Sequence, residues 1–419
     1  MDGRAASVGR PDPIANDHTQ ALSREAAAEL DARDPLRGFR ERFVIDPEVV
    51  YLDGNSLGCL PRATVPRLEN IVAQWGARGI RGWDEGWLEL PLEIGDRLGS
   101  AVLGAAPGQT VIGDSTTVCF YKLASAALDA RPGRGQILTD VDNFPTDRYV
   151  LEGLAAARGL ELVWLEGDRA GGPDPASVAS LVGPQTALVT FSHVSYRSAH
   201  VADMAAISRI VEDAGALMLW DLSHSAGSVK LSLDGDHAGL AVGCTYKYLN
   251  AGPGAPAYMY VRRDLQSELR QPIWGWLGRR DPFEMAPGYE VVRGMQGFLS
   301  GTPPILSLVA VDEGVRLVAE AGIEEIRAKG VELTEFAVAL ADAVLAPRGV
   351  SVASPREAAR RGAHVALAHP NARELCARLV ADGVIPDFRR PDVIRFGLSP
   401  LTTRFVDVWD GVEALRRFV

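Results

Sequence analysis

Cysteine is scarce in this 419-residue chain, and its four cysteines lie far apart, at positions 59, 119, 244 and 376. They have neither the close spacing of a zinc site nor the density of a disulfide-stabilised secreted domain. The sequence also lacks any run of about 18 uncharged apolar residues, and its N-terminus contains no apolar stretch of the kind found in signal peptides. We therefore expect a cytoplasmic protein with reduced thiols, no metal site and no membrane span.

Basic residues are outnumbered by acidic ones, 43 against 54, and the net charge is −11. A chain of this charge is poorly suited to bind nucleic acid or an anionic membrane, so we expect neither as a partner. Lysine in particular is rare, and the only lysines are Lys122, Lys230, Lys247 and Lys329. The position of each lysine is therefore more informative about a possible function than it would be in a lysine-rich chain.

Apolar segments of strand length alternate with helical segments from about residue 110 to 262. Strands are predicted at 136–139, 161–165, 187–191, 216–220, 240–244 and 257–261, and helices at 146–158, 175–182 and 204–214. Strands that are apolar throughout and alternate with helices are typical of a mostly parallel sheet covered on both faces. The predicted fold class is therefore α/β.

The length of the chain exceeds what one hydrophobic core usually serves, so more than one domain is expected. Residues 1–24 are predicted to be a mobile extension, and residues 25–65 a segment that packs with the small domain. The large α/β domain spans 66–304, and a smaller α+β C-terminal domain spans 305–419. The further elements predicted are helices at 23–33, 305–320 and 372–382, strands at 49–52, 365–368 and 393–397, and a helix opened by Pro61.

Several polar side chains directly follow the predicted strands. Ser192 follows the strand at 187–191, Asp221 follows 216–220, and Lys247, the only lysine at a strand end, follows 240–244. In a doubly wound sheet these positions meet at one edge, where ligands bind. The segment NFPTDRY (143–149) comes after another strand, and Thr116 and Thr117 precede a helix predicted at about 118–130.

This set of residues suits pyridoxal phosphate (PLP). The cofactor needs an amine for a Schiff base, a carboxylate beside its ring nitrogen and donors for its phosphate. Lys247, Asp221 and the helix start at Thr116 and Thr117 offer these three groups. Taken singly, a strand-end lysine is usually solvated and a strand-end aspartate usually caps a helix, so the residues alone leave both interpretations open.

The same residues lie in motifs that resemble those of the kynureninases, PLP enzymes of the aspartate-aminotransferase fold (fold type I). From about residue 34 to the C-terminus the matching motifs are YLDGNSLG (51–58), DNFPTDRY (142–149), FSHVSYRS (191–198), WDLSHSAG (220–227), YKYLNAGPG (246–254), GWLG (275–278), SGTPPI (300–305) and IRFGLSPL (394–401). DGNSLG, NFPTD and GWLG in that order are the most specific. The resemblance implies that the large domain binds PLP.

The resemblance also implies a role for each matching residue at the cofactor. Lys247 is the Schiff-base lysine, Asp221 the partner of the pyridine nitrogen, and His224 the histidine beside that aspartate. Phe144 stacks on the cofactor ring, and Asp147 is a second acid near the ring edge. Further phosphate and ring contacts are implied for Thr116, Thr117, Ser192 and Tyr246.

Other matches concern the neighbouring subunit and the substrate. Trp276 and Thr302 match phosphate contacts that the family takes from the second subunit, which implies a homodimer. Arg395 matches the arginine that grips the substrate's α-carboxylate, a task suited to a planar guanidinium. Ser56 and Trp83 match residues near the substrate's aromatic end.

The implied reaction is hydrolysis of the Cβ–Cγ bond of L-kynurenine to anthranilate and L-alanine, within tryptophan catabolism and NAD biosynthesis. Lys247 removes the Cα proton. Tyr246 is a candidate proton shuttle, for which its pKa must fall toward neutrality. Trp83 stands where relatives that favour 3-hydroxykynurenine carry histidine, so we expect a preference for the unhydroxylated substrate.

Arg279, Cys119, the pair Ala199-His200 and Thr402 depart from the family's usual residues, so 3-hydroxykynurenine or a modified kynurenine stays open as the substrate. Two other kinds of function are considered. One is another enzyme of this fold: an aminotransferase, or a cysteine desulfurase with Cys376 as its nucleophile. The other is a non-catalytic scaffold, which has no need of Lys247, Asp221 and Arg395 together.

Overall fold

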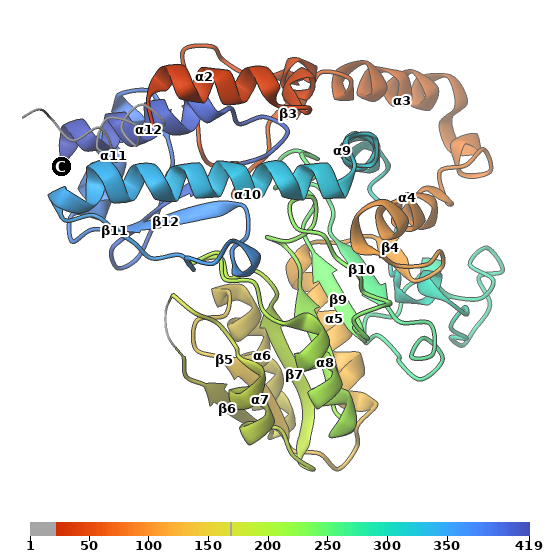
Figure 1. The fold of residues 1–419 in the computed structure, drawn as a ribbon. Coiled ribbons are helices and arrows are strands. Elements are labelled where there is room, and N and C mark those ends of the chain that lie inside the picture. The colour runs from red at the N-terminus through yellow and green to blue at the C-terminus, as the bar shows by residue number, and fades with distance from the viewer. Residues whose placement is uncertain (1–21, 168–169) are drawn as a thin grey trace, which may run out of the picture.

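A computed structural model describes residues 22–167 and 170–419 of the chain (Figure 1). Most of the extension predicted at residues 1–24 lies outside the described residues. The helix predicted from Ser23 is present as α2 (Arg24–Arg33). Ser23 is its N-cap, with Oγ accepting a hydrogen bond from the backbone N–H of Ala26 at 3.1 Å.

In the described part of the chain, the large sheet has seven strands in the order β4-β10-β9-β8-β7-β5-β6. The strands are β4 (Thr110–Ile112), β5 (Gln136–Asp140), β6 (Glu161–Leu165), β7 (Thr186–Ser192), β8 (Leu217–Asp221), β9 (Leu240–Gly243) and β10 (Tyr258–Val261). Neighbours pair in parallel, except that β10 is antiparallel to both β9 and β4. The predicted mostly parallel sheet is confirmed, and each predicted strand lies within about a residue or two of its observed position.

Helices cover both faces of this sheet because successive side chains of a strand point to opposite sides. Leu217 and Leu219 pack with α5 (Thr116–Asp129) and α6 (Pro145–Arg158). Met218 and Trp220 pack on the other face with α7 (Pro175–Leu181) and α8 (Met204–Asp213). The indole of Trp220 donates a hydrogen bond to Ser208 Oγ of α8 at 3.1 Å. Both faces are buried, which explains why the strands are apolar throughout.

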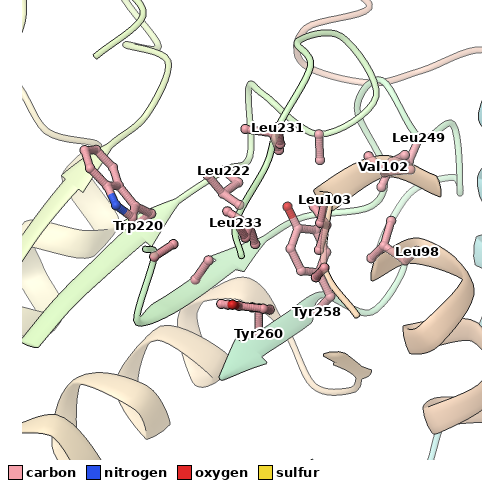
Figure 2. Close-up of a cluster of buried hydrophobic side chains, with 14 of the residues drawn as sticks. Leu98, Val102, Leu103, Trp220, Leu222, Leu231, Leu233, Leu249, Tyr258 and Tyr260 are labelled. Atoms are coloured by element: carbon pink, nitrogen blue, oxygen red, sulfur yellow. The ribbon is translucent and has the colours of Figure 1, made fainter. Parts of the chain in front are cut away.

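A further part of the core joins α4 (Leu90–Leu98) and the π-helical turn Gly99–Leu103 to the edge of the sheet. Figure 2 shows Leu98 and Leu103 beside Tyr258 of β10, all within one cluster of buried side chains. Tyr260 of the same strand donates a hydrogen bond to Asp234 at 2.9 Å. These contacts anchor β10 and therefore one end of the segment that connects it to β9 and contains Lys247.

The C-terminal part forms an antiparallel sheet of β11 (Ser351–Val352), β12 (His364–Ala368), β15 (Val393–Gly397) and β14 (Asp387–Arg389). Its helices are α9 (Ile305–Ala321), α10 (Ile323–Leu340), α11 (Ala372–Ala381) and α12 (Phe405–Phe418). The helices and strands predicted in this region are present. Short 3₁₀ or π turns complete the chain at Arg37–Arg42, Gly79–Trp83, Trp276–Gly278, Met295–Phe298, Ala341–Leu345, Ala346–Arg348 and Ala358–Arg360.

The N-terminal segment lies against this C-terminal sheet and its helices. Helix α2 runs beside α12, as the red and blue ribbons of Figure 1 show. The carboxylate of Asp31 accepts the backbone N–H groups of Phe405 and Val406 at 2.7 and 3.1 Å, which caps the start of α12. Strand β2 (Val50–Tyr51) pairs in parallel with β13 (Val384–Ile385).

The prediction that Pro61 opens a helix is wrong. Pro61 lies in β3 (Leu60–Pro61), which pairs with β1 (Phe43–Val44), and helix α3 (Thr64–Arg78) begins three residues later. Pro66, in the first turn of α3, is the proline whose missing N–H costs the helix nothing. No helix in the described residues is long and apolar enough to cross a membrane.

Candidate active site

The carboxyl ends of β7, β8 and β9 bring together the side chains around Lys247. Ser192 at the end of β7 pairs directly with Asp221 at the end of β8, and Asp221 pairs with Val242 of β9. Lys247 follows β9 by four residues and is 8% exposed. The structure therefore brings Lys247, Asp221 and Ser192 to one edge of the sheet, as the sequence predicts for a ligand site.

The amine of Lys247 lies against His224 and Phe144. Its Nζ is 3.3 Å from Nε2 and 3.4 Å from Nδ1 of His224, and 5.8 Å from the centre of the Phe144 ring. Burial, followed by the charge of Lys247, lowers the pKa of His224 well below its ordinary value. A neutral imidazole beside the lysine leaves one ring nitrogen able to accept a hydrogen bond from its amine.

Two buried carboxyl groups face the same place. Asp221 is 4% exposed, and its Oδ1 accepts the backbone N–H of Ser223 at 2.9 Å. Asp147, in the first turn of α6, is 2% exposed, and its Oδ2 has no hydrogen-bond partner among the described residues. Burial, and after it the nearby Asp221, raises the pKa of Asp147 well above its ordinary value, while Lys247 opposes the rise. An unpartnered buried carboxyl oxygen fits a site that receives a polar ligand.

The start of α5 provides the predicted place for a phosphate. Ser115 is its N-cap, Thr116 is its first residue, and Thr117 is exposed. A cavity of about 300 Å³ adjoins this helix start, and it is lined by Gly113, Asp114, Ser115, Gly254, Pro256, Leu299, Ser300, Gly301, Thr302, Pro303 and Pro304. Free N–H groups at a helix start bind anions, so the residues present fit a phosphate group.

Lys122 lies directly behind this helix start. It is fully buried, and its Nζ donates to Asp114 at 2.5 Å and to the carbonyl of Phe298 at 3.1 Å. The pair holds Asp114 in its left-handed conformation (φ 52°) at the cavity wall. Lys122 is thus bound within the fold and is not available as a Schiff-base amine.

Arg395 and Ser56 are in contact, although the resemblance assigns Arg395 to the substrate's α-carboxylate and Ser56 to its aromatic end. Arg395 of β15 is fully buried, and its Nη2 donates to Ser56 Oγ at 3.1 Å. Sequence reasoning missed two neighbours, Asp387 and Arg389, which lie on β14. Asp387 stands directly opposite Arg395 in the strand pairing and forms an ion pair with it. Residues of opposite charge on two short neighbouring strands were the signal that could have revealed this contact.

Trp83, Trp276 and Thr302 lie apart from Lys247 within this one chain, and the structure describes no contact between them and Lys247. Trp83 packs edge-on against Trp87, with ring centres 5.4 Å apart. It lines an apolar pocket of about 240 Å³ whose walls are Ile71, Trp75, Trp83, Trp87, Pro303, Ile305 and Leu306. Trp276 is half-buried and contacts Phe283, whereas Thr302 is exposed. The pocket and the Thr302 cavity share Pro303, so Trp83 and Thr302 lie near one another.

Tyr246 does not have the property expected of a proton shuttle. It is half-buried, and burial followed by the neighbouring Cys244 raises its pKa above the ordinary value of 10. A tyrosine that exchanges protons near neutral pH needs a shift in the opposite direction.

The departures from the family pattern are held by local contacts. Arg279 pairs with Glu284 at 3.0 Å and donates to the carbonyls of Asp281 and Gly288. Cys119 donates to the carbonyl of Gly113 at 2.9 Å. Nε2 of His200 accepts from Arg360 at 2.9 Å.

Comparisons with known proteins agree with the motifs. A family model described as the kynureninase C-terminal domain matches residues 326–415. A kynureninase of Burkholderia pseudomallei (strain 1106a) is 43% identical over 402 residues, which cover 94% of this chain and 95% of that protein. A kynureninase of Pseudomonas fluorescens is 39% identical over 394 residues, which cover 92% and 93%.

Solved structures show the same fold at lower identity. A cysteine desulfurase of Thermococcus onnurineus NA1 has a TM-score of 0.80 at 19% identity, covering 91% of this chain and 97% of its own. A variant of C-DES with glycine covalently linked to its PLP cofactor has a TM-score of 0.80 at 18% identity, covering 90% and 98%. The predicted fold of type I PLP enzymes is thereby confirmed. Because the curated relatives are about 40% identical over nearly their whole length, the chain belongs to the kynureninase family.

Proposed function

We propose that this protein hydrolyses the Cβ–Cγ bond of L-kynurenine, using PLP attached to Lys247, and releases anthranilate and L-alanine. The observation that carries the proposal is the buried group of Lys247, His224, Asp221 and Asp147 at one edge of the sheet, in a chain of the kynureninase family. A PLP site requires a lysine for the Schiff base and a partner for the pyridine nitrogen, and Lys247 and Asp221 offer these two groups.

Different residues of the site would hold different groups of the cofactor. Lys247 would bind its carbonyl carbon, Asp221 would pair with its ring nitrogen, Phe144 would cover a face of the ring, and the start of α5 at Thr116 and Thr117 would receive the phosphate. Asp147 offers its unpartnered Oδ2 to a polar group of the ring. When bound, PLP takes up the electron pair that remains on Cα after the proton leaves.

Lys247 performs the proton transfer at Cα. Its amine lies next to His224, whose pKa burial lowers well below the ordinary value. The Lys247 amine would accept the Cα proton as the general base of the reaction. One water is consumed, its oxygen ending in the carboxylate of anthranilate.

The test is direct. Purified protein loaded with PLP is expected to show a visible absorbance band and to convert kynurenine into anthranilate, followed by its fluorescence, with one L-alanine formed per anthranilate. A panel with 3-hydroxykynurenine and ring-substituted analogues then identifies the preferred substrate. A visible band without anthranilate formation from any of these substrates would contradict the proposal.

The desulfurase alternative receives no support from Cys376. That cysteine lies in helix α11, is 7% exposed, and its Sγ faces the carbonyl of Pro386 at 3.8 Å. Burial raises the pKa of its thiol to about 11. A sulfur-accepting nucleophile needs an accessible thiolate, which this position does not offer.

We also infer that two copies of the chain form a homodimer that works in the cytoplasm and completes each site with Trp276 and Thr302 of the partner. Large apolar side chains are exposed on the surface near these residues, including Trp75 at 59%, Trp274 at 65% and Met285 at 73%. Exposed large apolar side chains that gather near a site are what a protein interface would cover, and this supports the inference.

Complementation tests the shared site. Mixed dimers of Lys247→Ala and Thr302→Ala chains are expected to regain part of the activity, because one of the two sites then has both groups intact. A pairing of Lys247→Ala with Tyr149→Ala, an exposed aromatic on α6, is the control for subunit exchange. A monomer in sedimentation, or no recovery with Thr302→Ala, would contradict the inference.

A further inference from the structure

The N–H groups of Arg395 are nearly all used by the protein itself. Nε donates to Oδ1 of Asp387 at 2.7 Å, and Nη2 donates to Oδ2 of the same carboxylate. Nη2 also donates to Ser56 Oγ, and Nη1 donates to the carbonyl of Tyr196. A guanidinium has five N–H groups, so only one of them, on Nη1, lacks an acceptor among the described residues.

Because its N–H groups are already bonded within the protein, Arg395 has few left with which to bind a carboxylate. Its two-pronged edge, formed by Nε and Nη2, is occupied by Asp387, and a bidentate pair of this kind is among the strongest contacts in proteins. The Arg395 side chain is 1% exposed and the Asp387 side chain 12% exposed, so water does little to weaken the pair. An α-carboxylate would therefore find a single donor on Arg395.

Arg389 supplies the donors that Arg395 lacks. It lies on β14, two residues after Asp387, and its Nη2 is 2.7 Å from Oδ2 of Asp387 and 3.4 Å from Ser56 Oγ. Its side chain is 36% exposed, and the only other acceptor the structure describes for it is the carbonyl of Phe388, at 3.4 Å from Nη1. Two of its five N–H groups, the one on Nε and one on Nη1, thus have no acceptor among the described residues and are open to a ligand.

The two guanidiniums lie beside the lysine site. Arg395 and Arg389 both contribute to the lowered pKa of His224, which touches Lys247. Tyr196, whose carbonyl holds Arg395, packs edge-on against Phe144 with ring centres 5.5 Å apart. Asp387 and Asp53 are two carboxylates close to these guanidiniums, so it is the free N–H groups, and not a surplus of charge, that favour a ligand here.

We propose that Arg389 and Arg395 together receive the α-carboxylate of the substrate, and that Asp387 is the positioning residue that holds the two guanidiniums side by side. The proposal rests on the proposed function, which makes the substrate an α-amino acid. It assigns substrate binding to Arg389, a residue that the sequence motifs did not single out.

The test uses two probes that lack an amine, 3-benzoylpropanoate and 3-benzoylpropanamide, which differ only in the carboxylate. Calorimetry of the PLP-loaded wild-type protein is expected to show the acid binding about tenfold or more tightly than the amide. Arg389→Ala is expected to remove most of this difference while the affinity for the amide stays the same. Arg389→Lys should restore part of it, because it returns the charge without the planar fork. Arg390→Ala, an exposed arginine next in the chain, is the matched control.

Equal binding of acid and amide by the wild type, an unchanged preference in Arg389→Ala, or equal weakening of both probes would overturn the proposal. Arg389→Lys gives the same comparison if Arg389→Ala does not fold. The probes are not turned over, so the result is independent of kynurenine hydrolysis. A wild-type protein that prefers the acid but leaves kynurenine intact would refute the proposed function and support the carboxylate site.

Discussion

Nζ of Lys247 lies 3.3 Å from Nε2 of His224, and both side chains are buried at the carboxyl edge of the large sheet. The same amine lies 5.8 Å from the centre of the Phe144 ring, and Asp221 lies at the same edge of the sheet. Of the four lysines, Lys122 and Lys329 are held in buried ion pairs, and Lys230 lies at the surface beside Glu324. Lys247 is thus the lysine placed to react with a cofactor.

Replacing Lys247 by alanine is expected to lower kynurenine turnover by about 10³-fold or more, because both the covalent attachment and the proton transfer are lost. Borohydride reduction of the PLP-loaded wild type followed by peptide mapping should place the label on Lys247. Lys230→Ala should leave turnover and labelling unchanged. A label on Lys122, Lys230 or Lys329 would end the assignment.

The buried pair of Lys329 and Asp34 ties the N-terminal segment to α10. Their side chains are 5% and 4% exposed, and Nζ is 2.7 Å from Oδ2. Lys329→Met leaves Asp34 buried without its counter-charge and is expected to lower the free energy of unfolding by about 3 kcal/mol. Adding Asp34→Asn should recover much of the loss, because the amide oxygen is still able to accept the N–H of Leu36.

Urea unfolding measures these changes, and Lys230→Met, which breaks an exposed pair with Glu324, is the control expected to show no measurable change. If Lys329→Met alone is as stable as the wild type, the pair does not hold the segment. If the double variant is no better than the single one, the loss comes from packing and not from the uncompensated charge.

Asp53 is expected to make stability depend on pH. Burial, and after it the charge of Asp387, raises the pKa of Asp53 from 3.8 to about 6 in the folded protein. The fold therefore favours the protonated form, so the stability from Asp53 is present below about pH 4 and is lost as the pH rises through about 6. At pH 7, Asp53→Asn should be more stable than the wild type by roughly 1–3 kcal/mol.

Urea unfolding of Asp53→Asn and the wild type from pH 4 to pH 8 checks this sign. The difference between the two proteins should grow between pH 4 and pH 7 and then level off. A constant difference across that range, or one that favours the wild type at pH 7, would show that Asp53 ionises in the fold without cost.

Trp83 is expected to favour kynurenine over 3-hydroxykynurenine. Its pocket is walled by Ile71, Trp75, Trp87 and Leu306, and an indole offers one N–H donor and no acceptor. A hydroxyl buried there loses its water partners at a cost of roughly 1–3 kcal/mol, which is about ten- to a hundredfold in kcat/KM. Trp83→His should shift the ratio toward the hydroxylated substrate.

Arg279→His is the companion variant. Because the Arg279 guanidinium is held by Glu284 and by loop carbonyls, its replacement should leave the kcat/KM ratio unchanged. A wild-type ratio near one, or one that favours 3-hydroxykynurenine, would show that Trp83 only packs. A change of the ratio in Arg279→His would show that this loop reaches the substrate.

The sequence by itself determined the elements whose signal is local. The strands β7 and β8 and the helices α6 and α8 follow from apolar periodicity, and Ser23 caps α2 as its position predicts. Lys247 and Asp221 were found because a residue that follows a strand of a parallel sheet must lie at its carboxyl edge. The two-residue strands β1, β3, β11 and β13 were missed, since two residues carry no periodicity.

Only the tertiary structure decided which distant side chains meet. Asp387 occupies the donor edge of Arg395 because the register of β14 against β15 sets the two residues opposite each other. Asp31 caps α12 because α2 packs against that helix. Trp83 and Pro303 line one pocket although more than two hundred residues separate them in the sequence. Periodicity and capping depend on neighbours in sequence and are visible there. Register, docking and burial depend on which surfaces exclude water together, and that is settled only when the whole chain packs.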